Sequence, residues 1–346
     1  MEKTKIKKKV IVAMSGGVDS SVSAALLKGA GFDVSGVFMK LVDLPNFKTA
    51  ERRVEKIAKI LKVKLIILDL RKEFKKTIID SFLKEYAAGS TPNPCVLCNK
   101  EIKFGLVLKE SLKLDTDLFA TGHYARIKKD KKWIHLLKGS DKDKDQSYFL
   151  WRLDQNQLKR VLFPVGNLKR EEVEKMAKEL KLPVEQMKKS QEICFLEDIG
   201  EFLRKNLKTK PGKTVDVKGN VLGAHQGLPF YTIGQRKGIG LAGGPYFVLK
   251  KDSNKHLLIV TKNENNLYEK ELITRNVNWL SEKKPELPFR VQVKIRYRHK
   301  NVPALIYKKP GNKFKIIFNK PQRAITPGQS VVFYEGQELL GGGIIC

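Results

Sequence analysis

A glycine-rich loop near the N-terminus restricts the possible folds of this chain more than any other segment. The loop reads Ser15-Gly-Gly-Val-Asp-Ser-Ser21, and it follows an apolar run of strand length at residues 10–14. Apolar residues at helical spacing come next, over residues 18–28. Glycines permit a tight turn that exposes backbone N–H groups, and the following helix N-terminus adds partial positive charge. This order of elements predicts an anion-binding site that suits the phosphates of a nucleotide.

The side chains of the loop suggest how such a nucleotide would be held. We expect the hydroxyls of Ser15, Ser20 and Ser21 to donate hydrogen bonds to phosphate oxygens. Asp19 would repel phosphate unless Mg²⁺ lies between them, so we assign this carboxylate a metal-bridging role. The loop lacks the lysine of a Walker A motif. A second glycine motif, at residues 238–243, precedes a β-type run rather than a helix and therefore does not indicate a dinucleotide site.

The first half of the chain alternates between strand and helix patterns. Strands are expected over residues 10–14, 34–39, 64–68 and 118–120, and helices over 18–28, 49–61, 74–86, 102–112, 155–161 and 170–180. This alternation predicts an α/β fold with a doubly wound parallel sheet and helices on both faces.

The pattern changes after residue 206. A Pro, Gly and Lys-rich linker is expected over 208–214, followed by short β-type runs between Gly and Pro turns. We therefore expect two small β-rich domains, the last of them a β-barrel. The predicted domains are the α/β domain at 1–206, a central β-rich domain at 207–276 and the barrel at 277–346.

The chain carries a large excess of positive charge. Lys and Arg number 68 against 37 Asp and Glu, a formal net charge of +31, which attracts polyanions such as nucleic acid. A Lys-rich surface that only maintains solubility is the alternative reading. An expected strand over 290–297 would place Lys294, Arg296, Arg298 and Lys300 on one face. No apolar run is long enough for a membrane span or a signal peptide, so we expect a cytoplasmic protein without a membrane partner.

The cysteines are Cys95, Cys98, Cys194 and Cys346. A helix is expected to begin after Asn99, so Cys98 would lie at a helix N-terminus near Lys100 and Lys103. That position should lower the pKa of the thiol and favour a nucleophile. Half of a zinc site and inert buried thiols are the alternatives, because Cys194 and a distant histidine could complete a zinc site. Taken alone, Cys194 resembles a core cysteine, and Cys346 is treated as incidental.

Several motifs resemble known families. The loop at 15–21 resembles the pyrophosphate-binding loop of the N-type ATP pyrophosphatases, which cleave ATP between the α and β phosphates and transfer AMP to a substrate oxygen. A longer series resembles the bacterial tRNA-specific 2-thiouridylases over nearly the whole chain. Its further segments are residues 36–39, 92–104, 120–126, 144–150, 190–195, 231–238, 296–298, 326–329 and 340–345. The stretch between residues 39 and 64 is more compact and less acidic than expected of that family.

The resemblance implies ATP-dependent formation of 2-thiouridine at the wobble position of the tRNAs for Lys, Glu and Gln, with Mg²⁺. Cys98 would be the nucleophile, and Cys194 would carry a persulfide supplied by a donor such as a cysteine desulfurase or a sulfur-relay protein. The implied ATP-binding residues are Ala13, Met14, Ser15, Gly16, Gly17, Val18, Asp19, Ser20, Ser21, Met39 and Gly122. The implied tRNA-binding residues are Asn93, Pro94, Cys95, His123, Lys144, Asp145, Gln146, Arg296, Tyr297 and Gln329. Because Cys98 and Cys194 must meet, the segment around Cys194 is expected to move.

Two other functions compete with this interpretation. An AMP-forming enzyme with a small substrate would hydrolyse ATP in response to a metabolite rather than to tRNA. A non-catalytic RNA-binding protein with a redox or zinc Cys-x-x-Cys would bind tRNA without ATP turnover.

Overall fold

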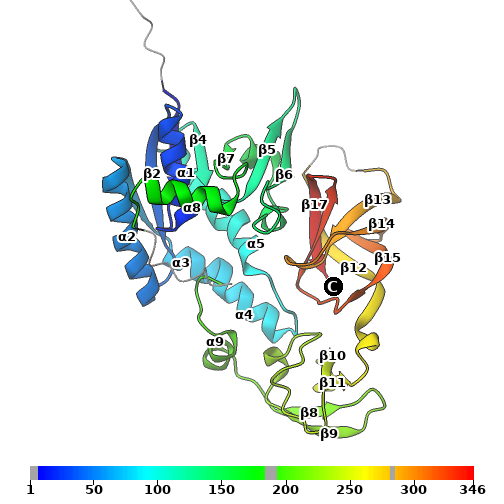
Figure 1. The fold of residues 1–346 in the computed structure, drawn as a ribbon. Helices are drawn as coiled ribbons and strands as arrows, with labels where there is room; N and C mark the ends of the chain where they lie inside the picture. Colours follow the sequence, from blue (N-terminus) through cyan, green and yellow to red (C-terminus); the bar gives the residue numbers. More distant parts are fainter. Residues whose placement is uncertain (1–6, 184–192, 281–284) are drawn as a thin grey trace, which may run out of the picture.

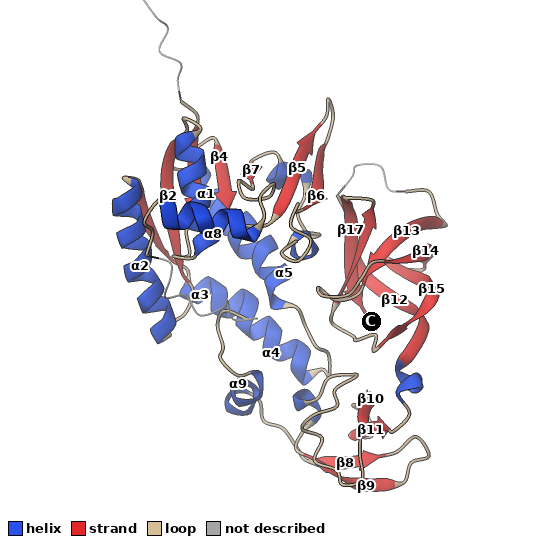
Figure 2. Cartoon of the chain, in the orientation of Figure 1, coloured by secondary structure: helices blue, strands red, loops and turns tan. Residues whose placement is uncertain are grey.

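The computed structural model describes residues 7–183, 193–280 and 285–346. The chain forms three lobes (Figure 1): an N-terminal lobe at the left and top, a central lobe at the bottom and a C-terminal lobe at the right. Helices gather in the N-terminal lobe, whereas the other two lobes consist mainly of strands (Figure 2).

A five-stranded parallel sheet forms the centre of the N-terminal lobe. Its strands are β1 (Lys9–Ala13), β2 (Asp33–Lys40), β3 (Lys64–Asp69), β4 (Leu118–Thr121) and β7 (Val161–Leu162). The strand order is β3-β2-β1-β4-β7, and all neighbours are parallel. The order reverses direction at β1, and open α/β sheets bind ligands beyond the carboxyl ends of the strands at such a point. The predicted doubly wound sheet is confirmed.

Helices cover both faces of this sheet because β1 alternates its apolar side chains between them. Val10 and Val12 belong to one buried cluster, and Ile11 and Ala13 belong to another. The first face carries α1 (Val18–Gly29), α2 (Pro45–Leu61) and α8 (Arg170–Glu179). The second carries α3 (Arg71–Phe74), the π-helix η1 (Lys75–Ile79), α4 (Asp80–Ala87), α5 (Pro94–Cys98), the π-helix η2 (Asn99–Val107) and α6 (Leu108–Leu112).

A hairpin of β5 (Ala125–Lys129) and β6 (Ile134–Lys138) extends from the N-terminal lobe and was not predicted. It pairs with the C-terminal lobe where Leu137 faces Glu338. Two short helices, η3 (Ser147–Phe149) and α7 (Gln155–Leu158), follow. The indole of Trp151 donates a 3.0 Å hydrogen bond to Ser330 Oγ. The two lobes therefore share one buried core.

The central lobe contains a four-stranded sheet of order β10-β11-β8-β9. Its elements are α9 (Ile199–Asn206), β8 (Gly212–Val215), β9 (Val221–His225), η4 (Leu228–Phe230), β10 (Phe247–Asp252), β11 (Leu257–Thr261) and η5 (Glu264–Leu267). The expected linker over 208–214 partly forms β8, since its last residues pair with β9 and β11.

The C-terminal lobe is a closed barrel of six strands, because its first and last strands also pair. The strands are β12 (Tyr268–Trp279), β13 (Phe289–Lys294), β14 (Val302–Lys309), β15 (Lys313–Arg323), β16 (Ser330–Glu335) and β17 (Glu338–Ile345). Alternate residues such as Val291, Val293 and Ile316 fill its interior. The predicted barrel is confirmed, and the expected domain boundary at 276/277 falls within β12.

The expected strand over 290–297 is too long. β13 ends at Lys294, and the chain then turns, with the His299 N–H bonded to the Arg296 carbonyl at 3.1 Å. The buried side chain of Ile295 directs this turn into the barrel core. The four cations from Lys294 to Lys300 therefore do not share one strand face.

No helix in the described part of the chain is long and apolar enough to cross a membrane.

Candidate active site

The glycine-rich loop joins the carboxyl end of β1 to the N-terminus of α1. Gly16 has φ +76°, and a Cβ at this position would lie 3.0 Å from the Ala50 carbonyl oxygen. Only glycine accepts both constraints without strain. The loop is therefore held against α2 with its backbone close to the open end of the sheet.

Two of the three predicted serine donors stabilise the loop itself. Ser20 Oγ and Ser21 Oγ donate to the Gly17 carbonyl at 3.1 and 2.7 Å. The Gly17 N–H donates to Ser15 Oγ at 3.3 Å, and Ser15 is exposed. In this structure Ser15 is thus the predicted hydroxyl that faces solvent, while Ser20 and Ser21 are buried.

The other expected ATP-binding residues surround the same loop. Ala13 and Met14 are buried at the end of β1. Gly122 follows β4, and a Cβ there would lie 2.6 Å from the Ser20 nitrogen. Met39, near the end of β2, belongs to the buried cluster that contains Cys98. The structure therefore brings these residues together at one edge of the sheet.

Asp19 is engaged by two partners that the sequence analysis did not identify. Arg170 Nη1 lies 2.5 Å from Asp19 Oδ1, and the Tyr124 hydroxyl donates to the same oxygen at 2.9 Å. Arg170 also bonds to Glu174 at 2.6 Å. Asp19, Tyr124 and Arg170 each lie in a predicted element or motif, but they are too distant in sequence for a local pattern to link them. Any Mg²⁺ held by Asp19 would compete with the Arg170 guanidinium.

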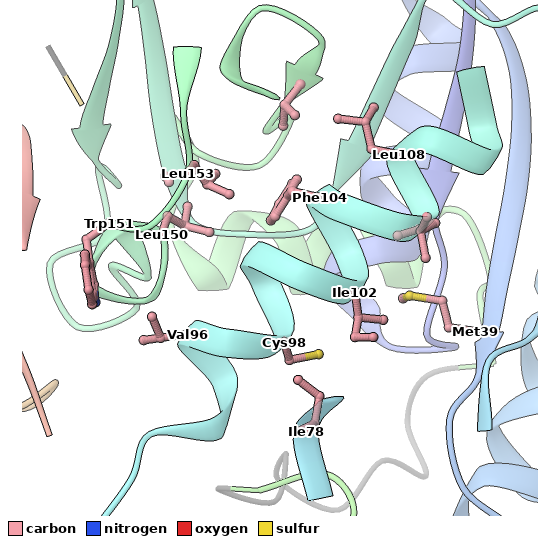
Figure 3. Packing of buried hydrophobic residues seen from close by; sticks show 14 of the residues in the cluster. Met39, Ile78, Val96, Cys98, Ile102, Phe104, Leu108, Leu150, Trp151 and Leu153 are labelled. Carbon is pink, nitrogen blue, oxygen red and sulfur yellow. The ribbon is translucent and has the colours of Figure 1, made fainter. Parts of the chain in front are cut away.

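The predicted environment of Cys98 is wrong in one respect. The helix begins at Pro94 rather than after Asn99, so Cys98 ends α5 and continues into η2 instead of lying at a helix N-terminus. Figure 3 shows its side chain between Ile78 and Ile102. Burial raises the pKa of the Cys98 thiol to about 12, and the charge of Lys103 only partly opposes this effect. The resting thiol is therefore protonated rather than activated.

The thiols of Cys95, Cys98 and Cys194 come close together at this position. Charges on Cys194 and Cys95 add to the effect of burial on the pKa of Cys98. The Cys194 side chain is exposed, but the protein atoms around it, followed by the charge of Cys95, raise its pKa to about 11. None of the four cysteines, all of which lie in the described ranges, forms a disulfide, and Cys346 is exposed. Residues 190–192 of the Cys194 motif lie outside the described residues. Within the described ranges, no group of three or more His, Cys, Asp and Glu is arranged to hold a metal ion.

The segment before Cys98, residues 90–94, is here called the junction segment because all three lobes meet on it. The Thr91 N–H donates to the Pro327 carbonyl at 2.9 Å, and Gln329 Nε2 donates to the Thr91 carbonyl at 2.8 Å. Thr91 Oγ1 lies 3.3 Å from Thr232 Oγ1 of the central lobe. Asn93 is the N-cap residue of α5 and Pro94 its first residue. Gln329 thus holds the segment that carries two of the expected base-contacting residues.

The remaining N-terminal residues expected to contact tRNA differ in exposure. His123 directly follows Gly122, and its Nδ1 lies 2.8 Å from Thr121 Oγ1. Burial, followed by the charge of Lys103, keeps the pKa of His123 well below its usual range. Lys144 is exposed, whereas Asp145 is buried and accepts N–H groups from Gly139 and Ser147 at 3.0 and 3.1 Å. Gln146 Oε1 accepts the Tyr124 N–H at 3.0 Å.

Arg296 and Tyr297 lie at the turn after β13. Arg296 Nη2 donates to the Ile233 carbonyl, the Ala324 carbonyl and Thr326 Oγ1 at 3.3, 2.9 and 2.6 Å. The buried Arg296 Nε has no hydrogen-bond partner among the described residues. The Tyr297 ring packs 4.6 Å from Phe149, with Lys294 Nζ 5.6 Å from its centre. Arg296 therefore connects the barrel to the central lobe, and Tyr297 contacts the N-terminal lobe.

Comparison with known proteins covers almost the whole chain. Three family models match: the tRNA methyl transferase HUP domain over residues 8–198, its PRC-barrel domain over 200–262 and the aminomethyltransferase beta-barrel domain over 269–345. The tRNA-specific 2-thiouridylase MnmA of Syntrophomonas wolfei is 44% identical, over 97% of this chain and 99% of that protein. The protein of the same name from Geobacillus thermodenitrificans is 42% identical, over 100% of this chain and 96% of its own length.

A solved 4-thiouridine synthetase–RNA complex with bound ATP is 20% identical and covers 50% of this chain and 40% of that chain. Its TM-score is 0.34, so the likeness between the two folds is partial. The full-length relatives are much more similar, and they share one name despite the methyl transferase wording of the family models. The chain belongs to the tRNA-specific 2-thiouridylase family.

Proposed function

We propose that this protein converts the wobble uridine of tRNA to 2-thiouridine, consuming ATP and releasing AMP and pyrophosphate. The observation that carries the proposal is the continuity between the nucleotide loop and the thiols. Gly122 lies against the loop, and His123 follows Gly122 in the chain. Lys103 acts electrostatically on His123 and also on the three thiols. A base held there would be close to both the nucleotide and the sulfur carriers.

The first half of the reaction activates the base. The C2 oxygen of uridine attacks the α-phosphorus of ATP, the bond to the departing pyrophosphate breaks, and the oxygen becomes part of an AMP leaving group. The N-terminus of α1 and the exposed Ser15 would bind the negative phosphates. The bonds from Arg170 and Tyr124 to Asp19 both end on Oδ1. We propose that Asp19 would hold a Mg²⁺ ion bound with ATP, in competition with Arg170, and that the ion would supply positive charge that screens the phosphates.

The second half transfers sulfur. A donor protein, such as a cysteine desulfurase or a sulfur-relay protein, would leave a persulfide on Cys194. The Cys98 thiolate could attack the inner sulfur, break the S–S bond and release hydrosulfide, which replaces AMP at C2. A Cys98–Cys194 disulfide remains, and an external thiol must reduce it before the next turnover. Alternatively, the terminal sulfur attacks C2 directly and Cys98 resolves the adduct.

The charge of the chain supports a tRNA substrate. A net charge of +31 strengthens encounters with a polyanion, and a uridine must leave the base stack before its C2 atom can react. We propose the tRNAs for Lys, Glu and Gln as the substrates.

The test uses an unmodified tRNA transcript with ATP, Mg²⁺ and either sulfide or a desulfurase with cysteine. Pyrophosphate release and 2-thiouridine are measured separately for the wild type, Cys98→Ser, Cys194→Ser and the control Cys346→Ser. We expect the first two variants to release pyrophosphate but to form no 2-thiouridine from the desulfurase, while the control behaves as the wild type. Equal product from all four proteins would refute the thiol mechanism. Pyrophosphate release that does not depend on tRNA would refute the substrate.

A further inference from the structure

Two lysines of the π-helix η2 have opposite environments. Lys100 Nζ lies 2.7 Å from Asp154 Oδ2 and donates to Gln157 Oε1 at 3.1 Å, so a carboxylate neutralises its charge. Lys103 has no hydrogen bond or ion pair within the described residues, although its side chain is half-buried. Its neighbours in the chain, Ile102 and Phe104, are both core residues. Among the described residues, an ammonium group in such a place therefore lacks the counterion that burial normally requires.

The helix geometry directs Lys103 toward the site. In a π-helix each N–H bonds to the carbonyl five residues earlier, so residues five apart lie on similar faces of successive turns. Cys98 immediately precedes η2, and Lys103 follows it by five positions. The ring of Phe104, the residue after Lys103, lies 5.8 Å from the His123 ring. Lys103 therefore lies one π-helical turn after Cys98, and its charge also acts on His123.

The electrostatic effects agree with this placement. Lys103 lowers the pKa values of Cys95, Cys98 and Cys194, and it is the only cation among the described residues found to act on all three. Burial opposes it at each thiol and has the larger effect. The sulfur chemistry needs an anion at Cys98 or on the persulfide of Cys194, in a place where apolar packing disfavours anions.

We propose that Lys103 is the charge-balancing residue of the sulfur-transfer step, whose ammonium stabilises the anionic form of Cys98 and of the persulfide on Cys194. It is a positioning residue, because it acts through the sulfurs rather than by contact with the base. The proposal deepens the proposed function and relies on it for the reaction, but the electrostatic effect on the thiols can be measured without that reaction.

The test compares four proteins: wild type, Lys103→Met, Lys103→Arg and the control Lys109→Met, which removes one charge from an exposed position of neighbouring α6. Each is treated with iodoacetamide in the absence of ATP and tRNA, and alkylation of each cysteine is followed by peptide mass spectrometry as a function of pH. Cys346 is exposed and is the internal reference in each protein.

We expect Lys103→Met to slow alkylation of Cys98 and Cys194 by about tenfold near neutral pH and to shift both rate–pH profiles to higher pH, because one charge contributes about one pKa unit or more. Lys103→Arg and Lys109→Met should stay close to the wild type, and Cys346 should not change. Lys103→Gln is the second neutral variant if the Met protein does not fold.

Equal alkylation in Lys103→Met and Lys109→Met would overturn the proposal. So would slow alkylation in Lys103→Arg as well, since that result would indicate a structural effect rather than a charge effect. If wild type forms no 2-thiouridine while the alkylation rates change as expected, the proposed function fails but the role of the charge stands.

Discussion

Substitution of Gly122 by alanine tests whether the end of β4 holds the nucleotide loop in place. The new Cβ would lie 2.6 Å from the Ser20 nitrogen and 2.7 Å from the Asp19 carbonyl carbon, both of them backbone atoms. An ordinary contact needs about 3.5 Å, so the loop or β4 must move by about 1 Å. Overpacking of this kind typically costs about 1–3 kcal/mol.

This cost can be divided between folding and binding. If the loop moves in the folded protein, the N–H groups at the start of α1 leave their phosphate-binding positions, and ATP affinity should fall by about 5-fold to 150-fold for the same range of free energy. If the native loop is restored only with strain, the melting temperature should fall by several degrees instead. Calorimetric titration with ATP and thermal unfolding by circular dichroism measure the two effects.

Gly29→Ala is the matched control. No heavy atom lies within 4 Å of a Cβ added there, and the position ends α1 of the same domain. Alanine is favoured over glycine in a helix by about 1 kcal/mol, so this variant should be slightly more stable and should bind ATP normally. A Gly122→Ala protein with the melting temperature and ATP affinity of the wild type would refute the assigned role of Gly122.

Three further substitutions test other contacts of the site and the fold. Arg170→Met should lower the Mg²⁺ concentration needed for half-maximal pyrophosphate release, because Arg170 no longer competes for Asp19; an unchanged Mg²⁺ dependence would argue against that competition. His135 bonds to two carboxylates that raise its pKa, so its stabilising effect is complete below the unfolded value of about 6.5 and is lost as pH rises through the higher folded value. His135→Gln should therefore melt with less dependence on pH than wild type as the pH rises above about 6.5, and equal slopes would contradict this. Gln329→Ala removes the bond to Thr91 and should lower the rate of thiolation without changing ATP affinity; an increase only in the KM for tRNA would instead indicate direct contact with the RNA.

Patterns that repeat within a single element were predicted well from the sequence. The continuous apolar run of β1 and the helical spacing of α1 correctly predicted a strand followed by a helix, with the glycine-rich loop between them. The β-type runs after residue 206 correctly indicated two β-rich lobes. The hairpin of β5 and β6 was not predicted, because the motif at residues 120–126, which overlaps the start of β5, was interpreted only as a functional site, and because Lys128 and Lys129 interrupt the apolar pattern of β5.

Contacts between distant segments could not be predicted from local pattern. The pairing of Asp19 with Arg170 depends on how α8 lies against α1, which no residue spacing reveals. The state of Cys98 depended on where its helix begins: Pro94 is a favourable first helical residue, and this signal places the thiol inside the helix. Local chemistry alone suggested an activated thiol, whereas burial in the assembled core dominates its pKa.

The bonds of the junction segment have a consequence for protein synthesis. Domains fold in order from the N-terminus as the chain leaves the ribosome. Thr91 belongs to the first lobe, but its partner Gln329 emerges 238 positions later, together with Pro327 of the barrel. The segment that leads to Cys98 therefore reaches its final position only after most of the barrel has been synthesised. Chains that have not yet reached the barrel would contain the nucleotide loop without a properly held thiol, so the capacity to react arises only once the barrel is in place.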